Sequence, residues 1–102
     1  MIDEIERHRE QIAALCRRYG ISRLELFGSA AAETFDPVAS DVDFFYEFGP
    51  GEGRGLADRF FDFHEAIEQL IGRRVDLVSS RDATNPYFLQ VANRNRRTIY
   101  AA

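Results

Sequence analysis

The chain has 102 residues, of which 45% are hydrophobic and 29% charged, so it fits a single domain over residues 1–102 and excludes a multidomain enzyme. Its 13 basic residues are all arginine and face 17 acidic ones, and a net charge of −4 argues against nucleic acid or an anionic membrane as a partner. The absence of lysine excludes Schiff-base chemistry and a P-loop lysine. One cysteine, no apolar run of about 18 residues and no secretory signal predict a cytoplasmic protein.

The first third of the chain predicts a helix, a strand and a short helix. Apolar residues recur at helical spacing over residues 2–19, and Gly20 follows where a helix would end. Residues 23–27 alternate as a strand does and lead directly into Gly28 and Ser29. Residues 30–33 are strong helix formers, before Pro37 breaks the pattern.

The remainder predicts two strands, two helices and a closing edge strand. Residues 41–48 alternate as a strand with its acids on one face, and the glycine-rich stretch 49–55 is either a connector or a phosphate cradle. A long helix is expected over 56–70, ending at Gly72, and then a strand over 74–79. Asn85 can cap a last helix with Pro86 in its first turn, and residues 98–100 can form an edge strand. The order of elements predicts an α/β or α+β fold, a small mixed β-sheet with helices packed on one side.

Three acids are candidates for chemistry. Asp41 and Asp43 emerge on the same face of their predicted strand, and Asp76 lies within the apolar strand 74–79. Carboxylates meeting within about 4 Å would repel by up to about 4 kcal/mol per pair at an effective dielectric of about 20. A divalent cation held by oxygen ligands would offset this repulsion. The alternative is that these acids face solvent and bind nothing.

Gly28 and Ser29 indicate an anion site, because they follow a strand and begin a helix. Glycine lets the backbone approach a phosphate closely, the free N–H groups of a helix start favour an anion, and the serine adds a hydroxyl donor.

The combination resembles the nucleotidyltransferase superfamily that includes DNA polymerase beta. Gly28-Ser29, an 11-residue spacer, Asp41-Val42-Asp43 and a later Asp76 follow the pattern of that superfamily. In length and element order the chain is most similar to the minimal nucleotidyltransferases, the antitoxin partners of HEPN-domain toxins. The resemblance covers nearly the whole chain.

The resemblance implies a fold, a reaction and a site. Asp41, Asp43 and Asp76 would be the catalytic carboxylates and would bind two Mg²⁺ ions, with Asp76 next to the attacking hydroxyl. Gly28 and Ser29 would hold the triphosphate of ATP, a nucleoside triphosphate acting as co-substrate. The implied function is an antitoxin that transfers AMP to a tyrosine of a HEPN toxin, within a hetero-oligomer and without direct contact to nucleic acid.

The chain also departs from the family, which usually has a basic residue after Gly-Ser and then Ala-Arg-Gly. Here Ala30, Ala31, Ala32 and Glu33 follow, and the spacer is one residue longer. The rival hypothesis is therefore a binding module that neutralises its toxin by contact alone, with a degraded nucleotide site. A third reading, a D-x-D glycosyltransferase, requires a larger domain than 102 residues allow.

Other residues have structural interpretations. His64 and Cys16 are expected to pack on the core faces of their helices. Arg94, Arg96 and Arg97 favour an interaction with the dipole at the end of the last helix. The aromatic residues Phe60, Phe61 and Phe63 are more than one buried stripe of the long helix requires, so Phe61 is a candidate for a partner surface.

Overall fold

The computed structural model describes residues 3–31, 41–50 and 55–102. Within them, β1 (Ile21–Phe27), β2 (Val42–Phe48), β3 (Val75–Ser79) and β4 (Arg97–Ala101) form one sheet in the order β3-β2-β1-β4. β1 runs antiparallel to β2 and β4, whereas β2 and β3 are parallel. The sheet is therefore mixed, as predicted, and β4 is the expected edge strand.

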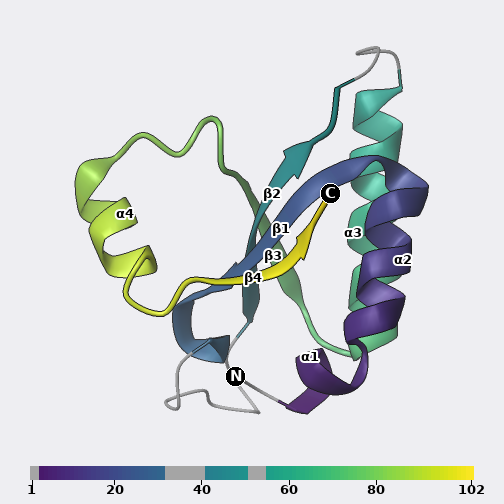
Figure 1. Cartoon of the computed structure of the whole chain (residues 1–102), viewed down its shortest axis with the longest axis horizontal. Coiled ribbons are helices and arrows are strands. Elements are labelled where there is room, and N and C mark those ends of the chain that lie inside the picture. Colours follow the sequence, from purple (N-terminus) through teal and green to yellow (C-terminus); the bar gives the residue numbers. More distant parts are fainter. Residues whose placement is uncertain (1–2, 32–40, 51–54) are drawn as a thin grey trace.

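One side of the sheet is covered by the helices α1 (Asp3–Arg7), α2 (Arg9–Tyr19) and α3 (Leu56–Ile71), and α2 and α3 lie side by side (Figure 1). The single helix predicted over residues 2–19 is interrupted at His8. The ring Nδ1 of His8 lies 2.8 Å from the carbonyl of Glu4, the acceptor that an unbroken helix would offer to the backbone N–H of residue 8. α3 ends where predicted, at Gly72, whose left-handed backbone directs its N–H to the carbonyl of Glu68.

The main core lies between these helices and the sheet. It takes its buried side chains from α2, α3 and the strand positions that point toward them, and it includes Ile12, Cys16, Leu24, Leu26, Val42, Phe44, Phe63 and Ile67. The alternation predicted for residues 41–48 is confirmed, because Val42 and Phe44 belong to this core while Asp43 lies on the other face.

A smaller cluster forms on the opposite face of the sheet. Phe27 and Phe45 stack with ring centroids 4.1 Å apart, and Ala92 of α4 (Pro86–Ala92) packs against them. Asn85 caps α4 as predicted, since its Oδ1 accepts from the N–H groups of Tyr87 and Phe88. α4 therefore lies apart from the two long helices, at the left of Figure 1.

No helix in the described ranges is both long enough and apolar enough to cross a membrane.

Candidate functional site

The end of β1 brings the backbone against the acidic edge of the sheet. Gly28 has φ +76° and begins a short 3-10 turn, η1 (Gly28–Ala30), where the sequence predicted a helix over residues 30–33. A Cβ built on Gly28 would lie 2.7 Å from Oδ2 of Asp43, so only glycine permits this approach. Ser29 lies in the same turn, but its side chain and residues 32–40 are outside the described part of the structure.

Two of the three predicted carboxylates meet on adjacent strands. Asp43 of β2 is the register partner of Asp76 of β3, and parallel neighbours lie about 4.8 Å apart. Asp43 is half-buried, whereas Asp76 is exposed. Asp41 directly precedes β2, so it lies outside the strand, two residues before Asp43. The sheet thus brings together the residues that the sequence placed on one face.

The electrostatics of Asp43 reflect this arrangement. Burial, the charge of Asp76, a hydrogen bond with Asp76 and the charge of Asp41 together raise the pKa of Asp43 to about 6, and burial makes the largest contribution. An acid with such neighbours prefers to share a proton or to bind a cation. The proximity of Asp41 and Asp76 thus disfavours the charged form of Asp43.

The donor set fits a hard divalent cation. Carboxylate oxygens are the ligands that Mg²⁺ prefers. Within the described ranges, however, no group of three or more acidic, histidine or cysteine side chains is arranged so that it could hold a metal ion. Asp43 and Asp76 would hold such an ion first, and Asp41 is the third candidate.

A buried ion pair on the same face was missed by sequence reasoning. Glu25 of β1 is 6% exposed and receives two hydrogen bonds from Arg96, at 2.6 and 3.0 Å. Burial alone would raise the pKa of Glu25, but Arg96, aided by Arg23, outweighs it and lowers that pKa. The guanidinium of Arg96 also lies 4.3 Å from the ring centroid of Phe45.

This ion pair corrects the interpretation of Arg96 as a partner of the helix dipole. Arg96 lies beyond the end of α4 and contacts a strand 71 residues away in the chain. The available signal was an acid within the apolar strand 23–27, the same signal that singled out Asp76.

The structural interpretations of three other residues are confirmed. His64 is half-buried and its Nε2 lies 2.7 Å from the carbonyl of Val75. Cys16 is fully buried, and burial raises the pKa of its thiol to about 12. Phe61 is 65% exposed, so the surface needed for a partner exists, and the partner itself stays a prediction.

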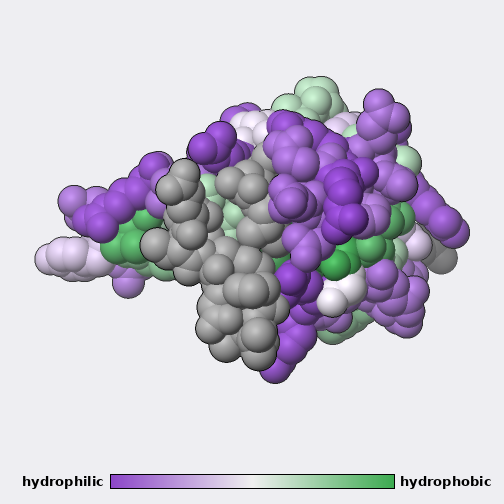
Figure 2. Space-filling model, turned by 90° about the horizontal axis from the view of Figure 1, so that it is seen from below, coloured by the Kyte–Doolittle hydropathy of each residue, from purple (hydrophilic) through white to green (hydrophobic). Residues whose placement is uncertain are grey.

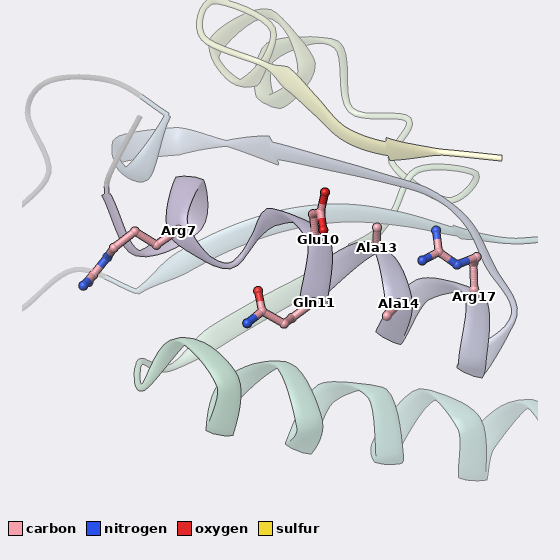
Figure 3. Close-up of a pocket in the computed structure, with 6 residues that line it drawn as sticks. All are labelled: Arg7, Glu10, Gln11, Ala13, Ala14 and Arg17. Atoms are coloured by element: carbon pink, nitrogen blue, oxygen red, sulfur yellow. The ribbon is translucent and has the colours of Figure 1, made fainter.

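A wide groove of about 880 Å³ runs along the outer side of α1 and α2, away from the carboxylates (Figure 3). Arg7 and Arg17 lie at opposite ends of it, and Ala13 and Ala14 lie between them. Among the described residues that line it, Glu10 is the one carboxylate, so they do not include the paired acids that metal-assisted phosphoryl transfer uses.

Paired carboxylates beside a tight glycine turn are groups that metal-assisted phosphoryl transfer can use. The nucleotidyltransferase domain family matches residues 8–101, and the chain belongs to that family. It is a nucleotidyltransferase, with the fold of the minimal nucleotidyltransferases.

Similar proteins agree with this assignment. A Methanocaldococcus jannaschii protein named "Putative protein adenylyltransferase" is 30% identical over 86 residues, which are 84% of this chain and 82% of that protein. A solved structure described as a "putative minimal nucleotidyltransferase" is 33% identical with a TM-score of 0.70, covering 93% of this chain and 94% of the other. A third match is a chain from the solved complex of a tri-AMPylated Shewanella oneidensis HEPN toxin with an MNT antitoxin. It is 15% identical with a TM-score of 0.61, and the match covers 95% of this chain and 72% of the other.

Proposed function

We propose that the protein is the antitoxin of a HEPN toxin and transfers AMP from ATP to a tyrosine of that toxin in a Mg²⁺-dependent reaction. The observation that carries the proposal is the pairing of Asp43 with Asp76 beside the Cβ-free backbone of Gly28. The name of the Methanocaldococcus jannaschii relative supports adenylyl transfer to a protein, and the complex of similar fold supports a HEPN partner.

The chain's own residues would divide the work as follows. Gly28 and Ser29 bind the leaving end of the triphosphate, and Asp41, Asp43 and Asp76 hold Mg²⁺. When bound, the metal neutralises charge that develops on the phosphates and lowers the pKa of the attacking hydroxyl. Asp76 orients that hydroxyl. A bond forms between the tyrosine oxygen and the α-phosphorus, the bond to pyrophosphate breaks, and the hydroxyl proton is released.

Neutralisation by contact alone is the second candidate. Ala30 and Ala31 are buried in the main core, so these two positions offer no positive charge to a triphosphate beside Gly28. A protein with this weakness would still present its surface to the toxin. The two candidates share the partner and differ in whether the toxin is modified.

Asp76→Asn separates the two candidates, because Asp76 is exposed on β3 and its replacement keeps the shape of the surface. The wild type is expected to add an adenylyl group to a tyrosine of the purified toxin, detected by labelled ATP and mass analysis. Asp76→Asn should bind the toxin equally and label it at least about a hundredfold more slowly. Asp62→Asn, an exposed acid on α3, is the matched control and should behave as wild type.

Rescue of the growth of cells that express the toxin decides between the two candidates. If the wild type leaves the toxin unmodified and Asp76→Asn rescues growth as well as the wild type does, adenylylation is wrong and contact neutralisation replaces it.

A further inference from the structure

A small hollow lies between β3 and the start of α4, on the same sheet face as the carboxylates. Its volume is about 300 Å³, and Val78, Ala83 and Phe88 form its apolar walls. We call it the β3–α4 hollow. Val78 follows Asp76 by two residues, so the two side chains leave the same face of β3 about 7 Å apart. Phe88 packs against the rings of Phe27 and Phe45, and these two rings belong to the cluster on that face.

We propose, as an extension of the proposed function, that the β3–α4 hollow binds the aromatic ring of the acceptor tyrosine and directs its hydroxyl toward Asp76. The first support is the order of groups across the sheet. Gly28 ends β1, Asp43 lies on β2, and Asp76 lies on β3 at the sheet edge. Phosphoryl transfer needs the attacking and leaving oxygens roughly in line across the phosphorus. With the leaving group at Gly28, the acceptor belongs on the side of Asp76.

The second support is the wall opposite β3. Phe88 packs edge-on against Phe27 and Phe45, with centroid distances of 5.7 and 5.9 Å, which fixes its ring. It is nevertheless 38% exposed, and this surface lines the hollow. A second aromatic ring can therefore pack against a wall that is already positioned. Figure 2 shows hydrophobic surface at its left side, where α4 lies, and a second hydrophobic area at the right of the view.

The third support is the state of the polar groups at the rim. Oδ1 of Asn85 already accepts two hydrogen bonds from the first turn of α4. The backbone N–H groups of Asp82 and Ala83 already donate to the carbonyl of Ser79. These three atoms are engaged within the protein, so they do not offer hydrogen bonds to a nucleobase, although the hydroxyls of Ser79 and Thr84 also line the hollow. An aromatic ring needs no such recognition along its sides.

Charge is the fourth support. Asp82 lines the hollow, and the negative charge of its carboxylate opposes a phosphate there. A tyrosine side chain is neutral at physiological pH and is not repelled. The hollow therefore suits an uncharged aromatic acceptor and does not suit the triphosphate of the co-substrate.

Binding can be measured without any turnover. N-acetyl-tyrosinamide is titrated into the isotope-labelled wild-type chain without nucleotide, and NMR shifts are followed at the methyl groups of Val78 and Ala83. We expect saturable shifts there, with much smaller shifts from N-acetyl-leucinamide and from AMP. If AMP shifts these methyl groups and the tyrosine amide does not, the hollow is a nucleobase site and the proposal is overturned. Absence of shifts from both compounds also overturns it.

Kinetics with purified toxin give an independent readout. Ala83→Leu fills the hollow and should raise KM for the toxin about tenfold or more while KM for ATP stays within about twofold, because added methylenes in an apolar pocket discriminate by about 10- to 200-fold. Val91→Ala is the matched control, since Val91 is 61% exposed on α4 and does not line the hollow. A rise in KM for ATP instead would contradict the proposal. If the wild type modifies no toxin but the tyrosine amide still shifts the methyl groups, the adenylylation proposal fails and the aromatic site stands.

Discussion

Gly28 is the residue on which the geometry of the carboxylates depends. Four described glycines have nearly the same left-handed backbone, with φ of +76° at Gly20 and Gly28, +77° at Gly55 and +69° at Gly72. They differ in their surroundings, because a Cβ at Gly28 would meet Asp43 whereas a Cβ at Gly72 would meet nothing within 4 Å. A comparison of two alanine variants therefore separates backbone strain from the contact with the carboxylate.

Gly28→Ala and Gly72→Ala should each lose about 1–2 kcal/mol of unfolding free energy, the usual cost of a left-handed backbone for alanine. Only Gly28→Ala should also lose the rise in Tm with Mg²⁺ and the transfer of AMP, because only there does the new methyl group displace Asp43. Urea unfolding with and without Mg²⁺ measures both effects. Equal responses to Mg²⁺ in the two variants would show that Gly28 does not position the carboxylate.

Asp43 also makes the stability of the metal-free protein depend on pH. Its pKa is about 6 in the folded chain against an ordinary value of 3.8. Between these values the folded state binds more protons than the unfolded state, so this group's contribution to stability falls as pH rises from about 4 to 6. The difference in unfolding free energy between wild type and Asp43→Asn, followed over that range, should show this fall. A flat difference would mean that Asp43 titrates normally.

At the scale of elements, the regular patterns were predictable and the pairings between distant strands were not. The apolar spacing of α3 and the capping residue of α4 are local, so their positions follow from short stretches of sequence. The face carrying Asp43 follows from the alternation of β2. The register that sets Asp43 opposite Asp76 depends on how β3 slides against β2, and the sequence contains no local signal for it.

A second contact between distant parts of the chain joins β1 to the segment before β4. Arg96 holds the buried Glu25 through two hydrogen bonds and covers the ring of Phe45. Its removal leaves the buried carboxylate with Arg23, whose Nε lies 3.3 Å from Oε1 of Glu25, as its remaining ionic contact in the described residues, so Arg96→Ala should cost about 1–3 kcal/mol of unfolding free energy. Arg94→Ala, an exposed arginine beside it, should change stability by no more than about 0.5 kcal/mol. Chemical denaturation of the two variants tests this, and similar small losses in both would contradict the role given to Arg96.

At the scale of the whole molecule, the net charge of −4 means that any added salt screens the repulsion between acidic residues. The effect of Mg²⁺ bound at a specific site must therefore be distinguished from this general screening. Mg²⁺ at ten times its Kd would stabilise the folded state by about 1.4 kcal/mol, and each kcal/mol shifts Tm by about 4–8 °C in a domain of this size. We expect such a rise in Tm for the wild type and a much smaller one for Asp41→Asn/Asp43→Asn. Asp58→Asn/Asp62→Asn removes the same charge from exposed positions of α3 and should respond as the wild type does. Calorimetry at matched ionic strength in NaCl provides the measurement. Equal rises in all three proteins would show that Mg²⁺ acts on overall charge rather than at the carboxylates.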